Sequence, residues 1–278
     1  MSNTVIHLAH SPDSDDAFMF YALAEGKVDS EDVDYVHELQ DIETLNQRAM
    51  RGELEVTAVS IHAYAYLADR YALLPHGASM GDRYGPKLVT RSPMKRRDLR
   101  GKRIAVPGAL TSAYLALRLY EPEFEPVFTP FDQIDASVMR GDVDAGLLIH
   151  EGQITYDAQG LHLVADMGEW WFGETGLPLP LGGNVIRKDL DDALRRKVSR
   201  HLKASIAYGL ANRTKALDHA MRYARGLDRS DADTFVGMYV NDWTLDYGER
   251  GREAIRQFLR RGVDAGVIPN PVTVEFAD

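Results

Sequence analysis

Short apolar segments alternate with longer helical patterns along most of this chain, and this alternation constrains the fold more than any other feature. Apolar segments that predict strands lie at residues 5–9, 33–39 and 55–60, and a helical pattern follows each of them. A second series begins at Arg103, with predicted strands at residues 104–106, 126–128, 143–149 and 161–165. Strands that alternate with helices in this way form parallel, doubly wound sheets. The chain is therefore predicted to be an α/β protein.

Two connections between the series predict more than one domain. Residues 92–103 are basic, polar and poor in apolar side chains, which indicates a surface connection at a domain boundary. Residues 177–186 contain Pro178 and Pro180, which is too much proline for a central strand, so we expect an extended crossing back to the first domain. Several amphipathic helical patterns follow, at residues 194–210, 216–224, 231–241 and 249–263.

This layout is that of a two-lobed periplasmic-binding-protein-like (type II) fold, with two α/β domains, a cleft between them and a helical C-terminal part. We predict a larger, discontinuous lobe of residues 1–91 plus 187–278 and a smaller lobe of residues 92–186. A small ligand would lie in the cleft between the two lobes.

Charge and cysteine content exclude several classes of function. The 278 residues include 42 acidic and 32 basic side chains, a formal net charge of −10, which argues against a nucleic-acid partner. The absence of cysteine excludes disulfides, zinc–thiolate sites, iron–sulfur clusters and cysteine nucleophiles. No signal peptide and no run of about 20 apolar residues is visible, so we expect a cytoplasmic protein that does not insert into membranes.

A histidine at the end of a buried strand is the best candidate for acid–base chemistry. The apolar run at residues 143–149 stops at His150-Glu151. Open α/β sheets bind ligands at the carboxyl ends of their strands. An imidazole, with an ordinary pKa of about 6.5, both takes and gives protons near neutrality. The alternative is a structural histidine that caps the next helix or bonds a backbone carbonyl.

Three other strand-to-helix junctions should line the same cleft. They are residues 11–16, Val59-Ser60 and residues 107–113. In the last, Gly108 permits an unusual backbone angle, and Thr111-Ser112 offer hydroxyls and free amides at a helix N-terminus, which suit a carboxylate or phosphate. Ser and Thr are also routine caps, so this signal is weak alone. Asp13, Asp15 and Asp16 are equally consistent with capping and with a role in the cleft.

Motifs for cofactors and metals are absent from the sequence. We find no Walker A motif, no Rossmann glycine fingerprint, no H-E-x-x-H and no G-x-S-x-G, and the histidines lack metal-ligand spacing. We therefore expect neither a cofactor nor a metal site.

Six ordered motifs carry a resemblance to a known family. They are SPxxxDxFxFYAL from Ser11, DIETLN from Asp41, VS followed by AYA from Val59, AVPG with TSAY from Ala105, AGLLIHE from Ala145, and EWW with TGLPLPLG from Glu169. Together they resemble the 1,4-dihydroxy-6-naphthoate synthases of the futalosine route to menaquinone, over about residues 8–245. Chorismate dehydratase shares the fold, but the I-H-E strand end and the TGLPLPLG crossing resemble the synthases more.

The resemblance implies a cofactor-independent carbon–carbon lyase that converts cyclic dehypoxanthinyl futalosine to 1,4-dihydroxy-6-naphthoate and a small sugar-derived fragment. It implies that His150 is the general base and that the substrate is a small carboxylate. A homodimer is compatible with this expectation. The residues that we expect to bind substrate are Ser11, Asp16, Asn46, Ala58, Val59, Ser60, Thr111, Ser112, Ala113 and Glu151, the last of which would also orient the imidazole.

Two departures from the family pattern concern the cleft. The family often reads SPCPNDTF where this chain has acids at Asp13 and Asp15, and it often carries a Lys at the position of Ala58. Both changes make the cleft less favourable for a carboxylate, and Lys87 or Arg83 would be the compensating cation. The alternatives are a non-catalytic solute-binding protein, which the missing signal peptide disfavours, and a chorismate dehydratase-like lyase that acts on an enolpyruvyl compound.

Overall fold

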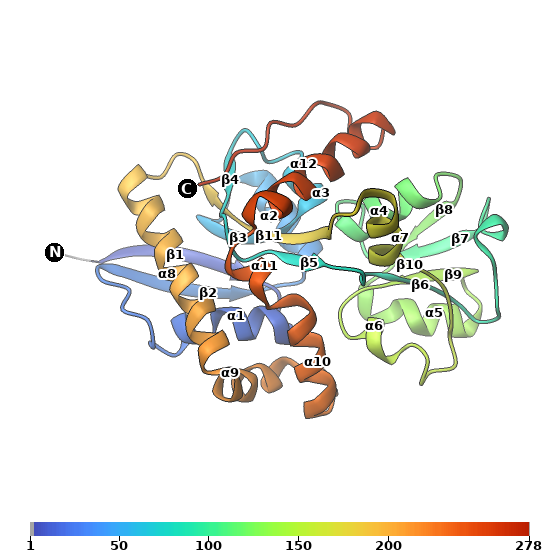
Figure 1. Cartoon of the computed structure of the whole chain (residues 1–278), viewed down its shortest axis with the longest axis horizontal. Helices are drawn as coiled ribbons and strands as arrows, with labels where there is room; N and C mark the ends of the chain where they lie inside the picture. The colour runs from blue at the N-terminus through green and yellow to red at the C-terminus, as the bar shows by residue number, and fades with distance from the viewer. Residues whose placement is uncertain (1–2, 278) are drawn as a thin grey trace.

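Two β-sheets lie side by side along the long axis of the chain, each covered by its own helices (Figure 1). The structure is a computed structural model that describes residues 3–277. Residues 1–2 and Asp278, which the predicted larger lobe includes, lie outside this range. Both ends of the described chain lie in the first lobe (Figure 1).

The first sheet has the strand order β2-β1-β3-β11-β4, and β5 pairs with the early part of β11. Its strands are β1 (Thr4–His10), β2 (Val33–Leu39), β3 (Val56–Ser60), β4 (Tyr71–Leu73), β5 (Ser79–Gly81) and β11 (Leu179–Arg187). The second sheet has the order β10-β6-β9-β7-β8. Its strands are β6 (Lys87–Thr90), β7 (Arg103–Val106), β8 (Glu125–Phe128), β9 (Ala145–Leu148) and β10 (His162–Asp166).

Helices occupy most of the predicted positions along the chain. The early and middle helices are α1 (Ser14–Ala24), α2 (Ile42–Arg51), α3 (Ile61–Tyr64), α4 (Ser112–Tyr120), α5 (Ile134–Arg140), α6 (Gly152–Thr155) and α7 (Met167–Thr175). The sequence analysis gave no residue range for α6 and did not predict α7. The C-terminal helices are α8 (Asp192–Ala211), α9 (Arg213–Ala220), α10 (Arg229–Tyr239), α11 (Asp242–Leu245) and α12 (Gly248–Asp264), with short 3₁₀ turns at Arg96–Asp98, Phe131–Gln133 and Met221–Tyr223.

The α/β two-lobed fold is confirmed, but the prediction of purely parallel sheets is wrong. β1 runs parallel to β2 and β3, and β7 runs parallel to β8 and β9. β6 is antiparallel to β9 and β10, and β11 is antiparallel to β3, β4 and β5. The antiparallel strands are those that carry the chain between the lobes, so both sheets are mixed.

The predicted extended crossing at residues 177–186 does return the chain to the first lobe, but the expectation that it is no central strand is wrong, because β11 lies between β3 and β4 in the first sheet. Pro180 lies where β11 pairs with β5, next to a register irregularity that ends at Gly182. Pairing with β3 starts at Gly182 and continues to Ile186, beyond the prolines. Proline therefore stands only at the irregular end of the strand, where a missing N–H costs no regular ladder bond.

The sheets also bear on the predicted lobe boundaries. β6 precedes residue 92 but belongs to the second sheet, and β11 precedes residue 187 but belongs to the first. A division by sheets thus places residues 87–166 in the second lobe. The exact division of the chain into domains stays a prediction.

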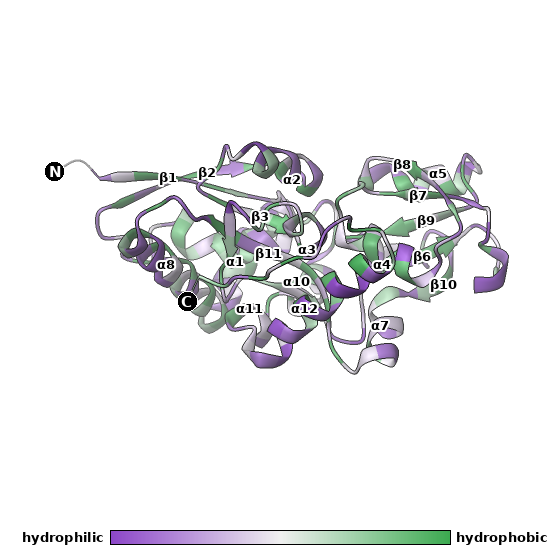
Figure 2. Cartoon of the chain, turned by 90° about the horizontal axis from the view of Figure 1, so that it is seen from above, coloured by the Kyte–Doolittle hydropathy of each residue, from purple (hydrophilic) through white to green (hydrophobic). Residues whose placement is uncertain are grey.

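Hydrophobic burial joins the two lobes on one side of the molecule. One buried cluster includes Tyr64 and Val185 of the first lobe, Leu115 and Trp171 from the helices of the second, and Phe258 of α12. α12 packs against β11, α3 and α4 and so touches both lobes. Figure 2 shows that α12 is largely hydrophilic outside this contact, while β9 is hydrophobic. Among residues 3–277, none of the helices has the length and hydrophobicity that a membrane span requires.

Candidate functional site

A cavity between the lobes collects most of the predicted site residues. It encloses about 740 Å³, including its opening to solvent, which is within the range of small-molecule sites. The predicted residues that line it are Ser11, Asp16, Ala58, Val59, Ser60, Thr111, Ser112, Ala113 and His150, together with Asp13 and Asp15, whose roles the sequence left open. Asn46 and Glu151 do not line the cavity.

His150 follows β9 in a turn with a left-handed backbone (φ 52°). This conformation is uncommon for a residue with a Cβ and tends to occur at functional sites, where the surrounding structure enforces it. The side chain is 15% exposed, and its ring contacts Phe131 edge-on, with a centroid distance of 4.9 Å. The turn thus directs the imidazole into the cavity rather than onto the following helix.

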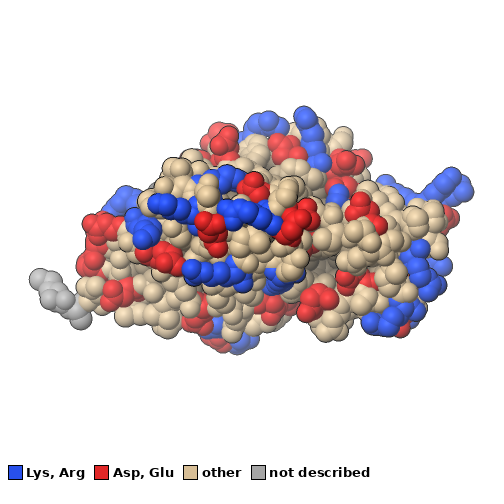
Figure 3. Space-filling view, turned by 90° about the horizontal axis from the view of Figure 1, so that it is seen from below, with Lys and Arg blue, Asp and Glu red and all other residues tan. Residues whose placement is uncertain are grey.

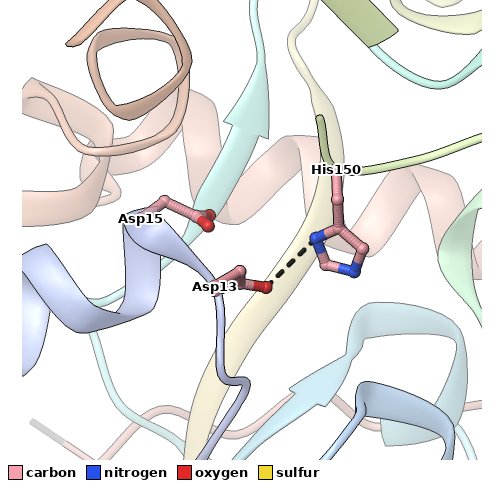
Figure 4. A group of neighbouring side chains, drawn as sticks. All are labelled: Asp13, Asp15 and His150. Carbon is pink, nitrogen blue, oxygen red and sulfur yellow. Dashed lines mark ion pairs between the residues drawn. The ribbon is translucent and has the colours of Figure 1, made fainter. Parts of the chain in front are cut away.

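Asp13 faces His150 from the opposite lobe. Its Oδ2 lies 3.1 Å from Nδ1 of the imidazole, and Figure 4 shows Nε2 on the side of the ring away from Asp13. Oδ1 of Asp13 accepts a hydrogen bond from the amide of Asp16 and so caps α1. A carboxylate can only accept, so Nδ1 carries the hydrogen and Nε2 is left as the basic nitrogen.

The pKa values of this pair move apart. Burial alone lowers the pKa of His150, but the hydrogen bond and charge of Asp13 outweigh burial and raise that pKa above its ordinary value. Burial alone raises the pKa of Asp13, yet the hydrogen bond and charge of His150 hold it below its ordinary value. Asp13 is therefore the ionised partner of the imidazole.

The two neighbouring carboxyls hold their protons more tightly. Burial, and then the charge of Asp13, raises the pKa of Asp16 to about 8, although the amide of Ser11 donates to its Oδ2 at 2.7 Å. Burial and the charges of Asp13 and Asp16 raise the pKa of Asp15 well above its ordinary value. Near neutrality the N-terminus of α1 thus combines the carboxylate of Asp13 with the protonated carboxyl group of Asp16, and Asp15 holds its proton more tightly than usual.

Glu151 does not orient the imidazole as expected. Its side chain is buried, Oε1 has no hydrogen-bond partner within the described chain, and Oε2 lies 3.9 Å from Nη1 of Arg225. Burial raises its pKa. Arg225 also donates to the carbonyl of Pro12 and lies over the ring of Phe131, so it joins the two lobes at the edge of the site.

Ser60 is held in place by Asn46. The amide of Ser60 donates to Oδ1 of Asn46 at 2.9 Å, and Nδ2 of Asn46 donates to Oγ of Ser60 at 3.1 Å. Asn46 itself is fully buried in α2, behind the cavity wall. Because the Ser60 hydroxyl accepts from Asn46, its own hydrogen is free to be donated to a ligand.

The N-terminus of α4 presents free amides to the cavity, because its two hydroxyls are already hydrogen-bonded within the protein. Thr111 caps the helix by accepting from Tyr114, and its hydroxyl donates to Gly108. The hydroxyl of Ser112 accepts from the amide of His62 and donates to Leu181. The amides of Ser112 and Ala113, in the first turn, have no intrahelical acceptor and suit an anion.

Gly108 suits its position for a different reason than predicted. It is not among the described glycines with a positive φ. A Cβ at this position would lie 2.5 Å from Oε2 and 2.8 Å from Cδ of Glu43, which belongs to α2 of the other lobe. The glycine therefore permits close approach of the lobes.

Several cavity residues carried no sequence signal. Tyr239 of α10 and Gln153 of α6 line the cavity and hydrogen-bond to each other across the lobes. Asn184 of β11 lines it too, and its buried Oδ1 has no partner within the described chain. The one signal that could have revealed Asn184 was a polar residue in β11, which the sequence analysis did not recognise as a central strand.

No lysine or arginine is among the described residues that line the cavity. The suggestion that Lys87 or Arg83 supplies a cation is wrong, because Lys87 pairs with Asp166 at 2.7 Å and Arg83 stacks on Phe172 at 4.3 Å. On the outside, acidic and basic side chains are interspersed over the face drawn in Figure 3. A carboxylate bound in this cavity would therefore meet neutral hydrogen-bond donors and the imidazole.

One group in the described part of the chain could hold a metal ion. The candidate ligand atoms of Asp13, Asp15 and His150 lie within 4.8 Å of one another (Figure 4). A metal bound through Nδ1 of His150 would replace its hydrogen bond to Asp13.

Two lobes with a cavity between them define the class of the protein, the periplasmic-binding-protein-like fold. Solved structures of low identity agree. The alkanesulfonate-binding protein from Xanthomonas axonopodis pv. citri, bound to MOPS, is 14% identical with a TM-score of 0.70, covering 99% of this chain and 97% of that chain.

The sequence comparisons are more specific. A family model described as menaquinone biosynthesis matches residues 6–264, and this chain belongs to that family. The 1,4-dihydroxy-6-naphthoate synthase of Thermus thermophilus is 41% identical, covering 96% of this chain and 97% of that protein, and that of Streptomyces coelicolor is 39% identical, covering 97% and 96%. A crystal structure of an Archaeoglobus fulgidus protein is 49% identical, with a TM-score of 0.90, covering 95% of this chain and 98% of that chain.

Proposed function

We propose that this chain is a 1,4-dihydroxy-6-naphthoate synthase, a lyase that releases the naphthoate from cyclic dehypoxanthinyl futalosine. The observation that carries the proposal is an imidazole in an inter-lobe cavity, with a carboxylate 3.1 Å from its Nδ1, which leaves Nε2 as the nitrogen that can act as a base. Full-length similarity to two proteins named for this activity supports it.

In the proposed mechanism, neutral His150 removes a proton next to a carbonyl of the bound substrate through Nε2. The electron pair then moves to break the bond to the sugar-derived fragment, and aromatisation of the second ring favours this step. General-base assistance of this kind contributes about 10²–10⁴-fold. Closed lobes exclude water from the reacting atoms.

Neutral donors bind and stabilise the charges of the substrate in this proposal. Asn46 fixes Ser60 by two hydrogen bonds, and the first turn of α4, capped by Thr111, orients the amides of Ser112 and Ala113 before a ligand arrives. Donors that are already oriented stabilise a developing oxyanion without having to reorganise. The same amides are suited to a substrate carboxylate.

The test is product formation by the purified protein. Incubation with cyclic dehypoxanthinyl futalosine is expected to yield the naphthoate, measured by mass spectrometry. His150→Ala should lower kcat by about 10²–10⁴-fold and leave the calorimetric Kd for substrate within a few-fold. Substrate binding without product from the unsubstituted protein would instead identify a binding protein.

We also propose that the reaction needs no cofactor and that it takes place in the cytoplasm. Protein dialysed against a chelator should keep its full rate, and added divalent metals should not raise it. A rate that returns only with a metal would place an ion in the site and contradict this part of the proposal. The expected homodimer is tested separately by analytical ultracentrifugation.

A further inference from the structure

The pair Asp13–His150 joins the two lobes through the proposed catalytic base itself. His150 follows β9 of the second sheet, and Asp13 precedes α1 of the first lobe. The carboxylate of Asp13 is only 2% exposed. It is therefore a buried group of one lobe whose partner belongs to the other.

The two oxygens of Asp13 have separate partners. Oδ1 accepts from the amide of Asp16, 3.3 Å away, in the first turn of α1, and Oδ2 faces Nδ1 of His150. Because the cap fixes the carboxylate to the helix, the carboxylate can hold the imidazole in one orientation and one tautomer. The edge contact with Phe131 restricts the ring from the other side.

We propose that Asp13 is the positioning residue of the His150 base, and that closing the lobes completes this base by bringing the two side chains together. The inference rests on the proposed function and deepens it. It assigns to Asp13 a role that Glu151 was expected to have, at a position where the family often has a cysteine.

Other charged groups face His150 but do not replace Asp13. Asp15 and Asp16 of α1 lie beside Asp13, Glu151 is the next residue along the chain, and Arg225 lies across Phe131. The charge of Glu151 favours the imidazolium and that of Arg225 opposes it. None of these four has a hydrogen bond to His150 in the structure.

Two substitutions separate positioning from capping, since Asn and Ser both cap helices about as well as Asp. In Asp13→Asn, Oδ1 keeps the cap and Nδ2 becomes a donor that faces Nδ1 of His150. The imidazole must then accept at Nδ1 and carry its hydrogen on Nε2, the wrong tautomer for the base. Asp13→Ser keeps a cap but is too short to reach the ring.

We expect Asp13→Asn to lower kcat by about 10²–10⁴-fold, as much as loss of the base. Asp13→Ser should lower it less, by roughly tenfold, and move the acidic limb of the kcat/KM profile to lower pH. The limb moves to lower pH because the base acts in its unprotonated form and Asp13 raises the pKa of His150, so that removing Asp13 lowers this pKa. Asp191→Asn makes the same substitution at the cap of α8, away from the cavity, and should leave kcat unchanged.

The tautomer gives a readout that needs no turnover. ¹⁵N NMR of the imidazoles, with His150 assigned by the loss of its signals in His150→Gln, should show hydrogen on Nδ1 in the unsubstituted protein and on Nε2 in Asp13→Asn. Equal loss of kcat in the Asn and Ser variants, with an unchanged tautomer, would reduce Asp13 to a helix cap and overturn the inference. If the unsubstituted protein forms no naphthoate, the proposed function is wrong. The NMR measurement still shows whether Asp13 sets the tautomer of His150, because it does not depend on turnover.

Discussion

Three aspartates at the N-terminus of α1 show how local contacts give identical side chains different pKa values. Asp13 has an imidazole partner, and this contact keeps its pKa low in spite of burial. Asp15 and Asp16 are just as buried but face the charge of Asp13, so their pKa values rise. Of three carboxyl groups held so close together, the one with the imidazole partner ionises most readily.

Asp16 should make the protein less stable as pH rises. Its pKa rises from 3.8 to about 8 on folding, so between these values the unfolded chain releases a proton that the folded protein keeps. The free energy of unfolding then falls by up to about 1.4 kcal/mol per pH unit over this window, and the effect is absent below it. Asp16→Asn, which still accepts from Ser11, should flatten this dependence and stabilise the protein at pH 8.

Urea unfolding at pH 5, 6, 7 and 8 measures the difference. Asp15 contributes a slope of the same sign, so the variant should keep part of the dependence. Parallel curves for the variant and the unsubstituted protein would show that Asp16 titrates normally.

At the scale of elements, the loop between β7 and α4 approaches α2 across the lobes. Gly108 of this loop leaves no space for a Cβ beside the carboxyl of Glu43. The Oε2 of Glu43 is buried and has no hydrogen-bond partner in residues 3–277. The contact between Gly108 and Glu43 is therefore purely steric, and a shorter side chain at position 43 would break no hydrogen bond at this oxygen.

Gly108→Ala should hinder closure and raise KM by roughly fivefold, because the carboxyl end of Glu43 can shift aside and overpacking then costs about 1 kcal/mol, the low end of its range. Glu43→Ala in the same chain should restore KM. Gly173→Ala, in α7 with open space around the added Cβ, is the matched control and should change nothing. A double variant as impaired as the single one would mean that Glu43 is not the obstacle.

At the scale of the molecule, a shared core on one side and polar contacts on the other hold the lobes together. The shared core includes Trp171 and Phe258. On the cavity side, Tyr239 donates to Gln153, and Arg225 links Pro12 with Phe131. Polar contacts exchange with water at little net cost, so we expect this side to open and the apolar side to act as the hinge.

Tyr239→Phe should shift the lobes toward an open form. A single hydrogen bond contributes about 1 kcal/mol, which changes the ratio of closed to open about fivefold. Because the chain lacks cysteine, spin labels at Ala136→Cys in α5 and Ala211→Cys in α8 report the distance between the lobes. Tyr71→Phe removes a comparable bond within the first lobe, to Leu54, and should lower stability without altering the distance distribution. The idea fails if both variants give the same distribution.

The sequence predicted what depends on local pattern and missed what depends on distant partners. Strands, helices and the strand-end position of His150 follow from periodicity and caps. The pairing of Asp13 with His150 and that of Tyr239 with Gln153 join residues far apart in the chain, and no local signal reports them. β11 was misread because its prolines lie at one end, while Gly182 to Ile186 supply the regular pairing.

The place of β11 in the first sheet has a consequence for synthesis on the ribosome. All five strands of the second sheet lie between Lys87 and Asp166, so this sheet can be complete soon after that segment emerges. The first sheet holds β11 between β3 and β4, and must keep a central gap until Arg187 has been made. The lobe begun first is thus finished last, and during that interval the exposed edges of β3 and β4 are where a nascent chain is most open to wrong pairing or to a chaperone.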